Sequence, residues 1–183
     1  GRTLGALTWL LRLSGCDLRC WWCDSKQSSF REDEARERPW RSVLSAAVAS
    51  GAGWLSLTGG EPTWRGPAEL RSLVALCRAA RKQGLRIKIE SNGLRLPPEL
   101  DGLVDLWSVA PKFDSKVGAQ TPAMRHDVRV LRRLLRLQGP SGLQLKFVIC
   151  YDKAQPRRGD LEQAERLLKT LPLAAKRCPI FFI

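Results

Sequence analysis

Three cysteines near the start of the chain have the residue type and spacing that bind metals. Cys16, Cys20 and Cys23 lie in the stretch RLSGCDLRCWWCDS (12–25), with the spacing C-x3-C-x2-C. Thiolates spaced in this way can bind a metal ion or an iron–sulfur cluster from a single loop. A zinc site would need a fourth ligand from His126 or a distant cysteine, and neither is close by in the sequence. Three ligands suit a [4Fe–4S] cluster whose remaining iron is open to an outside ligand.

The alternative is that these cysteines are ordinary buried thiols, because free cysteine is among the most buried residue types. The loop also carries Gly15, Asp17 and Arg19, which make it too polar for a core segment. Cys77 and Cys150 do lie in apolar runs, and we expect them in the core. A chain of 183 residues does not need a disulfide framework, so its six cysteines favour a reducing, cytoplasmic setting.

Two later motifs could contact a ligand. In TGGEP (58–62), paired glycines allow the backbone to approach a ligand closely, and Glu61 could bind an ammonium group. ESNG (90–93) is a weaker signal, because Asn-Gly is a common turn and Glu90 could be a capping carboxylate. Whether either motif could lie at a ligand site depends on the strands and loops that position it.

Short apolar runs alternate with longer helical patterns along the chain. This alternation predicts right-handed βαβ units with a parallel sheet of about six strands, either an open sheet or a partial barrel. The predicted strands are 7–13, 54–57, 85–90, 103–109, 143–150 and 179–183, and the predicted helices are near 40–50, 67–83, 121–138 and 159–171.

The motifs follow successive predicted strands. The cysteines follow the first strand, TGGEP the second and ESNG the third, and SVAPK (108–112) ends the fourth. Ligands of parallel α/β folds bind at the carboxyl ends of the strands. We therefore expect all four motifs on one rim of the sheet.

The motif set resembles the radical S-adenosylmethionine (SAM) superfamily, through C-x3-C-x2-C with an aromatic residue before the third cysteine, GGEP and E-x-N-G. RLSGCDLRCWWCDS, LTGGEPTW, IESNG and VAPK are similar to the 7-carboxy-7-deazaguanine synthase family, from about residue 7 to 150. The resemblance implies a partial, open parallel β/α barrel and one radical SAM core domain over 1–183. That family rearranges 6-carboxytetrahydropterin on the route to queuosine and other 7-deazapurines.

The resemblance also implies a role for each matching residue. In the superfamily, the open iron binds the amino and carboxylate groups of SAM, and the reduced cluster cleaves the sulfonium to a 5′-deoxyadenosyl radical. The implied cluster ligands are Cys16, Cys20 and Cys23. The implied SAM contacts are Trp22 at the adenine, Gly59, Gly60 and Glu61 at the methionine amino group, and Glu90, Asn92 and Ser108 at the nucleoside. Arg12 and Thr58 are the implied substrate contacts, with the Arg12 guanidinium paired to a carboxylate.

The chain departs from the family pattern in several places. The family has threonine where Ser25 stands, and its hydroxyl helps to hold Mg²⁺, which Ser25 could still do. The family's SPK reads APK at 110–112. The family's first strand and its Gln/Glu loop, which contact the pterin, have no counterpart before Gly1, and the family continues beyond PIFFI (179–183). We therefore expect either a fragment or a different pocket.

The function indicated is that of a radical SAM lyase that converts 6-carboxy-5,6,7,8-tetrahydropterin to 7-carboxy-7-deazaguanine, loses ammonia and regenerates SAM. The partners indicated are an electron donor such as flavodoxin or ferredoxin and a second copy in a homodimer. The first alternative is a radical SAM activase that forms a glycyl radical, or a peptide-modifying enzyme. No apolar run reaches the 18 or so residues of a membrane helix.

The second alternative is a cluster-containing nucleic-acid binder, because the net charge is +13. Arginines concentrate at 125–136 and 157–158, yet RVLRRLLRLQ has helical spacing, which indicates a basic outer helix face. No stacking aromatic residues alternate with these arginines. The pattern therefore favours solvated surface charge, and a nucleic-acid binder would leave GGEP unexplained.

Overall fold

The computed structural model describes residues 2–113, 127–149 and 158–183, so His126 and Cys150 lie outside the described residues. One six-stranded parallel sheet has the order β1-β2-β3-β4-β5-β6. Its strands are β1 (Thr8–Leu13), β2 (Trp54–Gly59), β3 (Arg86–Ser91), β4 (Leu106–Val109), β5 (Leu143–Phe147) and β6 (Ile180–Phe182). Because the order of the strands in space follows their order in the chain, each connection leads to the adjacent strand on the same side. This is the topology of a partial, open β/α barrel, as predicted, with β1 and β6 as its edges.

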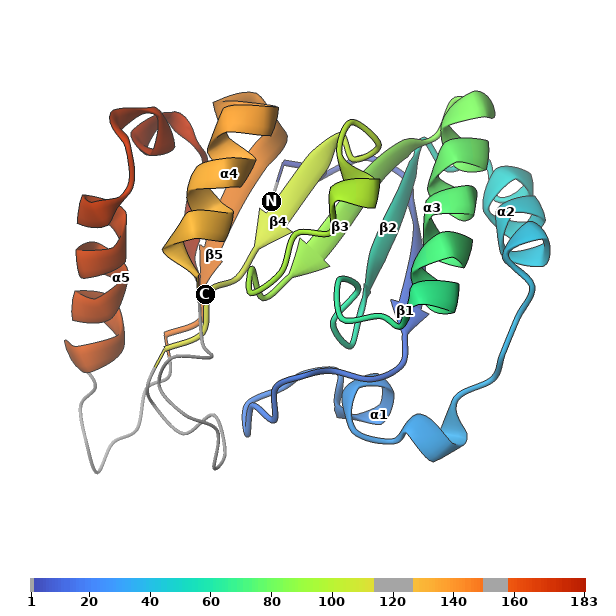
Figure 1. Ribbon diagram of the computed structural model, residues 1–183, viewed down its shortest axis with the longest axis horizontal. Helices are drawn as coiled ribbons and strands as arrows, with labels where there is room; N and C mark the ends of the chain where they lie inside the picture. Colours follow the sequence, from blue (N-terminus) through green and yellow to red (C-terminus); the bar gives the residue numbers. More distant parts are fainter. Residues whose placement is uncertain (1, 114–126, 150–157) are drawn as a thin grey trace.

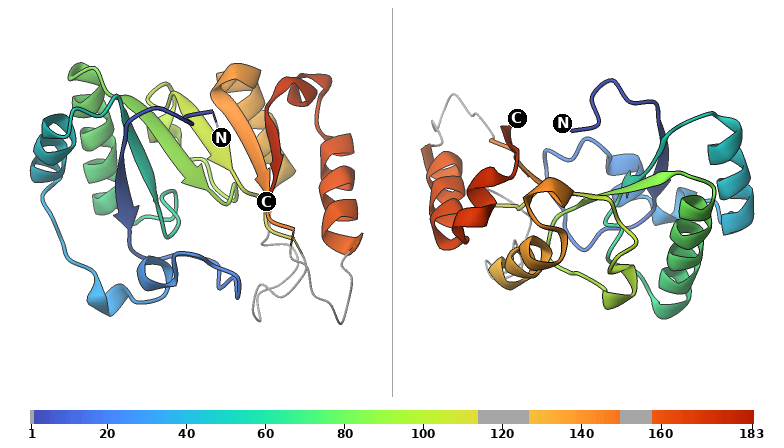
Figure 2. Two further views of the ribbon diagram at one scale, coloured as in Figure 1. Left: turned by 180° about the vertical axis from the view of Figure 1, so that it is seen from behind. Right: turned by 90° about the horizontal axis from the view of Figure 1, so that it is seen from above.

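The longer helices cover one face of the sheet, whereas the shortest lies beyond the ends of the strands (Figure 1). Seen from behind, the strands lie in front of the helices (Figure 2). The helices are α1 (Lys26–Ser29), α2 (Trp40–Ala49), α3 (Pro67–Lys82), α4 (Val128–Gln138) and α5 (Arg158–Thr170), with short 3₁₀ helices η1 (Glu32–Glu34), η2 (Pro98–Leu100), η4 (Pro140–Gly142) and η5 (Leu173–Arg177). The six predicted strands and four predicted helices are confirmed, except that positions 121–126 and 150 of the predicted elements lie outside the described residues. Within the described residues, α1 and the 3₁₀ helices were not predicted, because they are too short to show a hydrophobic period.

Alternation along the strands separates the two faces of the sheet. Leu55 and Leu57 of β2 and Ile87 and Ile89 of β3 are fully buried in the main hydrophobic core beneath the helices. The residues between them therefore point to the opposite side, which we call the inner face. This inner face is available to position polar groups.

The arginines of α4 are partly used for packing between elements. Arg132 donates to the Thr170 carbonyl oxygen at 2.7 Å, and Arg133 donates to the Leu96 carbonyl oxygen at 3.1 Å and to Asp101 at 2.5 Å. The predicted basic helix face therefore ties α4 to α5 and η2 rather than lying entirely in solvent.

No helix in the described part of the chain is both long enough and apolar enough to span a membrane.

Candidate active site

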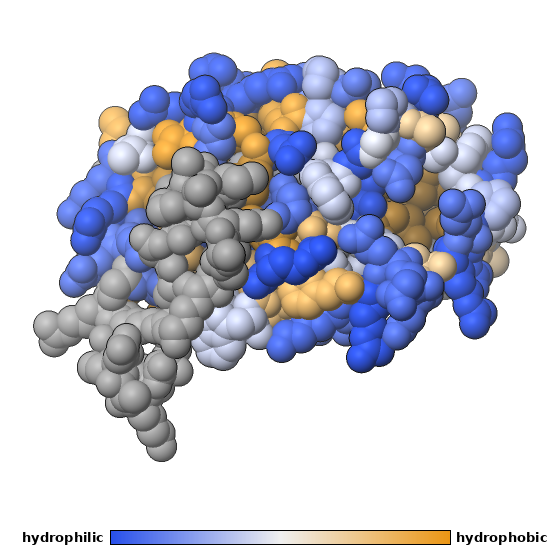
Figure 3. Space-filling model, turned by 60° about the horizontal axis from the view of Figure 1, so that its bottom comes forward, coloured by the Kyte–Doolittle hydropathy of each residue, from blue (hydrophilic) through white to orange (hydrophobic). Residues whose placement is uncertain are grey.

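The loops that follow β1, β2 and β3 meet at the edge where the strands end, at the bottom of Figure 1. Parallel strands bring their carboxyl ends to one edge, so the three motif-bearing loops are neighbours, as the sequence predicted. Hydrophilic side chains surround scattered hydrophobic patches when this end is brought forward (Figure 3). A cavity of about 550 Å³ lined by Arg81, Arg86 and Asp105 lies at the other end, where the strands begin, and does not belong to this site.

The cysteine loop packs around its own small apolar cluster, separate from the main core. Leu18 is 1% exposed and Cys20 is 6% exposed, and partly buried residues pack around them: Cys16, Trp22, Cys23 and, from the loop after β3, Leu94. None of the three cysteines forms a disulfide. The structure thus brings the three predicted cluster ligands together in one loop, and Leu94 ties that loop to the neighbouring one.

The thiol of Cys16 is strongly affected by its surroundings. Burial raises its pKa to about 12; the Leu18 amide, which donates to the sulfur at 3.4 Å, opposes this shift, and the carboxylates of Glu61 and Asp17 add to it. The thiol is therefore protonated at neutral pH, and any cluster that binds here must displace that proton.

The donor set fits an iron–sulfur cluster better than a single metal ion. Within residues 2–113, 127–149 and 158–183, no three or more His, Cys, Asp or Glu side chains converge tightly enough to hold one ion. In a [4Fe–4S] cluster each thiolate binds a different iron, so the sulfurs need not converge on one point. Three soft thiols on one loop, with an amide donating to one sulfur, match that ligand type.

The two glycines of the GGEP motif allow two loops to touch. Gly59 has a φ of +95°, and a Cβ there would lie 2.7 Å from the Leu13 backbone nitrogen. A Cβ on Gly60 would overlap the carbonyl oxygen of Gly15. Backbone bonds close the contact, because Gly60 N–H donates to Leu13 O at 2.7 Å and Glu61 N–H donates to Gly15 O at 2.8 Å. The sequence indicated close approach to a ligand, whereas here the glycines approach the cysteine loop.

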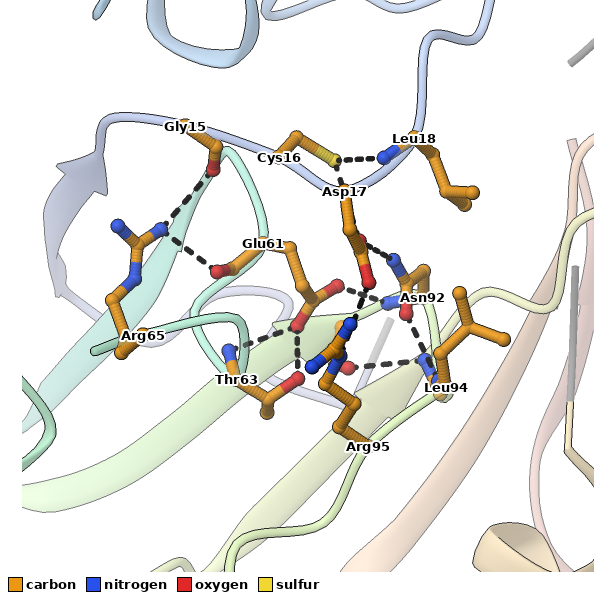
Figure 4. Close-up of polar contacts among 12 residues, drawn as sticks. Gly15, Cys16, Asp17, Leu18, Glu61, Thr63, Arg65, Asn92, Leu94 and Arg95 are labelled. Atoms are coloured by element: carbon orange, nitrogen blue, oxygen red, sulfur yellow. Dashed lines mark hydrogen bonds and ion pairs between the residues drawn. The ribbon is translucent and has the colours of Figure 1, made fainter. Parts of the chain in front are cut away.

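The carboxylate of Glu61 is 2% exposed and joins two loops (Figure 4). Its Oε1 accepts hydrogen bonds from the amide and hydroxyl of Thr63 at 3.0 and 2.7 Å, and its Oε2 accepts from the Asn92 amide at 2.7 Å. Burial raises the pKa of Glu61, and these hydrogen bonds oppose the shift. The Ser91 side chain also hydrogen-bonds this carboxylate, so donors from the protein account for about four acceptor positions and make Glu61 a structural junction.

Asn92 connects the loop after β3 to the cysteine loop. Its side-chain amide donates to Asp17 Oδ1 at 2.8 Å, and its Oδ1 accepts from the Leu94 amide at 2.9 Å. Arg95 also reaches Asp17, with 3.4 Å between Nε and Oδ2. Asn92 of ESNG and Arg95 after it therefore brace the cysteine loop, a contact that sequence spacing alone did not reveal.

Four residues predicted to contact substrate or nucleoside lie on one row of the inner face. Arg12 is paired with Thr58, and Glu90 with Ser108. Leu57 is paired with Ile89, so the residues that follow them, Thr58 and Glu90, are neighbours as well. The strand register therefore aligns residues from four strands beside the cysteine loop.

Two lysines and a glutamine outside the predicted ligand contacts surround this row. Glu90 forms ion pairs with Lys88 at 2.6 Å and with Lys146 at 3.6 Å, and Gln144 Nε2 donates to the Ser108 hydroxyl at 2.8 Å. Burial alone would raise the pKa of Glu90, but the Lys88 hydrogen bond and the two lysine charges lower it overall. The strand period could have identified Lys88, because it lies two residues before Glu90 and so shares its face.

Arg12 and Ser25 contact each other at the end of the row. Arg12 Nη1 donates to Ser25 Oγ at 3.1 Å, and the Ser25 hydroxyl donates to Asp24 Oδ1 at 2.8 Å. A Mg²⁺ ion bound by Ser25 would therefore compete with the Arg12 guanidinium for the same oxygen.

Trp22, the predicted adenine contact, packs edge-on against Trp21 with 5.7 Å between ring centroids.

The ion pairs of Glu90 predict a dependence of stability on pH. A carboxyl group whose pKa is lower in the folded state stabilises the fold above its unfolded value of about 4.5, and this contribution is lost as the pH falls through the folded pKa. Lys88→Met should lower the free energy of unfolding at pH 7 by about 1–2 kcal/mol and flatten its decline in acid. Urea denaturation from pH 7 to pH 3 measures both effects. Exposed Lys82→Met is the control, and an equal effect of both variants would contradict this role for Lys88.

Comparison with known proteins matches the motifs to one family. A sequence model of the radical SAM superfamily matches residues 10–115. A 7-carboxy-7-deazaguanine synthase of Rhodopirellula baltica is 28% identical over 96% of this chain, and one of Halobacterium salinarum is 33% identical over 81%. The chain spans 65% and 59% of the lengths of these two relatives.

The fold has solved counterparts in the same superfamily. Coproporphyrinogen III oxidase (HemN) from Escherichia coli, described as a radical SAM enzyme, superposes with a TM-score of 0.58 at 16% identity. The match covers 97% of this chain and 44% of the HemN chain. At this identity the likeness concerns the fold alone. The family match, the parallel sheet and the three-cysteine loop together show that the chain belongs to the radical SAM superfamily.

Proposed function

We propose that this chain converts 6-carboxy-5,6,7,8-tetrahydropterin to 7-carboxy-7-deazaguanine with loss of ammonia. The observation that carries the proposal is the row of Arg12, Thr58, Glu90 and Ser108 beside the cysteine loop. The two relatives described above bear the name of the synthase that makes this product. The row offers a guanidinium at one end and a carboxylate near the other, which suits a flat substrate with both acidic and donor groups.

The cluster and SAM would occupy the edge formed by the three loops. Cys16, Cys20 and Cys23 would hold the cluster, which supplies the electron that cleaves SAM. Gly59, Gly60 and Glu61 would receive the methionine amino group through the backbone of their loop. Trp22 would pack against the adenine, and Asn92 has one amide hydrogen left for the nucleoside after its bond to Asp17.

The inner face would hold the substrate and the nucleoside in register. Glu90, kept ionised by Lys88 and Lys146, accepts hydrogen bonds from hydroxyl or N–H groups. Arg12 would pair with the substrate carboxylate through two parallel N–H donors, and Thr58 would contact the substrate beside it. Ser108 is already fixed by Gln144, so its hydroxyl is oriented before a ligand arrives. The role of these residues is to bind, orient and exclude water.

The proposal extends to the setting of the reaction. It comprises one radical SAM core domain over 1–183, an electron donor such as flavodoxin or ferredoxin, a homodimer, and a cytoplasmic location where the cysteines stay reduced. The row on the inner face forms without an electron donor or a second copy of the chain. Each of these proposals can therefore be tested separately from the substrate.

Mass spectrometry of the reaction mixture tests the substrate. The chain is reconstituted anaerobically with iron and sulfide and mixed with dithionite, Mg²⁺, SAM and 6-carboxytetrahydropterin. We expect 7-carboxy-7-deazaguanine in excess of 5′-deoxyadenosine, because SAM is regenerated. Mixtures without SAM are the control. Accumulation of 5′-deoxyadenosine with the pterin unchanged would show that the substrate is a different one.

The competition at Ser25 predicts a modest Mg²⁺ effect. We propose that Mg²⁺ binds the Ser25 hydroxyl together with the substrate and displaces Arg12 Nη1 from it. Mg²⁺ should then raise turnover, and Ser25→Ala should abolish this stimulation while basal turnover falls by about tenfold or less. Steady-state rates with Mg²⁺ and with EDTA measure the effect. Ser42→Ala on α2 is the control, and undiminished stimulation of Ser25→Ala would contradict the assignment.

A further inference from the structure

The side chain of Arg65 joins the cysteine loop to the GGEP loop (Figure 4). Its Nη1 donates to the Ser14 carbonyl oxygen at 2.5 Å, and its Nη2 donates to the carbonyl oxygens of Gly15 at 3.1 Å and Glu61 at 2.8 Å. One guanidinium therefore binds the two peptide groups directly before Cys16 and the peptide group of Glu61. Arg65 lies 51 residues after Ser14 and 50 residues after Gly15 in the sequence.

Backbone hydrogen bonds and the Arg65 guanidinium hold the junction of the two loops. Gly60 and Gly15 meet backbone to backbone, and a side chain at Gly60 would overlap Gly15, so no side chain at that position can pack between the loops. Three carbonyl oxygens converge there, and like partial charges repel unless donors satisfy them. Backbone donors satisfy part of this set, because Glu61 N–H donates to Gly15 O at 2.8 Å and Trp64 N–H donates to Glu61 O at 3.2 Å. Arg65 supplies the remaining donors.

We propose that Arg65 is a positioning residue that fixes the distance between the first cluster ligand, Cys16, and the loop that receives the amino group of SAM. This inference rests on the proposed function, since SAM would have to contact the cluster and the GGEP loop at the same time. A change in the spacing of these loops would weaken one contact when the other forms. Arg65 acts through Gly15 and Glu61 and need not touch any ligand.

The chemistry of the contact explains why arginine stands here. The guanidinium is planar and carries several donors in a fixed fork, whereas a lysine ammonium is a single point with flexible reach. Burial lowers the pKa of Arg65, and the nearby carboxylates of Glu69 and Glu61 oppose that shift, so the group stays charged. A lysine could bond one or two of the three carbonyls but could not span them with the same geometry.

Two variants and a control test this inference without relying on turnover. Arg65→Met removes every donor, Arg65→Lys keeps the charge, and Arg71→Met changes an exposed arginine on α3. The readouts are hydrogen exchange of the Glu61 amide in the cluster-free chain, iron content after reconstitution, and the SAM dissociation constant by equilibrium dialysis. Each is normalised to the folded fraction, measured by circular dichroism.

We expect Arg65→Met to speed exchange of the Glu61 amide and to raise the SAM dissociation constant by about tenfold. Iron content should stay near that of the unchanged chain, Arg65→Lys should give intermediate values, and Arg71→Met should change nothing. Unchanged exchange at Glu61 in Arg65→Met would overturn the inference, and so would SAM binding that falls only in step with the folded fraction. If the unchanged chain binds no SAM, the proposed function fails, while the exchange of Glu61 still decides the role of Arg65.

Discussion

Cys20→Ala should leave the reconstituted chain without its cluster. Iron content should fall from about four atoms per chain to near zero, because two thiolates cannot retain a [4Fe–4S] cluster that already lacks a fourth protein ligand. Cys20 is the most buried of the three cysteines and packs with Leu18 in the small apolar cluster of the loop, so no outside thiol can replace it easily. SAM cleavage should disappear together with the iron. Iron and sulfide analysis of the reconstituted chain measures the loss.

The control for this experiment is another buried thiol in the same chain. Cys77 is fully buried in the main core, away from the cysteine loop. Cys77→Ala should reduce stability through a small cavity and leave iron content unchanged. A Cys20→Ala chain that still retains a full complement of iron would contradict the assignment of the cysteine loop.

Gly60→Ala should have the largest effect on stability of any conservative change at the site. The new methyl group would overlap the Gly15 carbonyl oxygen, which is backbone and cannot move without displacing the peptide before Cys16. The hydrogen bond from Glu61 N–H to Gly15 O would break, and two contacts of Arg65 would be strained. We expect a loss of about 3 kcal/mol or more in the free energy of unfolding. Urea denaturation measures it.

A glycine with free space around it separates this clash from a general effect of alanine. Gly53 precedes β2, and nothing lies within 4 Å of a Cβ placed there. Gly53→Ala should therefore change stability by only about 0.5 kcal/mol. If Gly60→Ala were as mild, the close approach of the two loops would be wrong, and the motif glycines would have to serve the ligand directly.

The fold could be predicted well from the sequence because its signals are local. Strands such as β2 and β5 are short apolar runs, and α3 and α4 show the helical period, so each element is visible within its own segment. Strand–helix alternation then fixes a parallel sheet, and the position of each motif at a strand end fixes its edge. This reasoning also placed Arg12, Thr58, Glu90 and Ser108 near one another, and the register added that they form one row.

The contacts between loops could not be predicted, because they depend on distances across the fold. Arg65 follows GGEP by only a few residues, yet nothing in its neighbourhood indicates that it binds Ser14 and Gly15. Likewise, the bond from Asn92 to Asp17 joins positions 75 residues apart. GGEP and ESNG indicated ligand contacts, and the structure shows that both motifs also hold the cysteine loop.

The high positive charge illustrates the same limit. Net charge predicts an electrostatic surface, but it does not show which arginines pack inside the protein. Arg65, Arg132 and Arg133 all donate to backbone carbonyl oxygens between elements. Part of the +13 charge therefore has a structural role, which weakens the case for a nucleic-acid surface.

Electron paramagnetic resonance of the reconstituted, dithionite-reduced chain tests the central claim most directly. A cluster held by only three cysteines has an iron that SAM can bind, so the signal of the reduced cluster should change when SAM is added. The comparison needs only the same sample before and after the addition, with 5′-methylthioadenosine, which lacks the amino and carboxylate groups, as a matched control for the nucleoside. A reduced-cluster signal that changes on addition of SAM is the result we predict. A loaded cluster whose signal stays the same at saturating SAM would show that the loops of Cys16 and Glu61 do not form a SAM site.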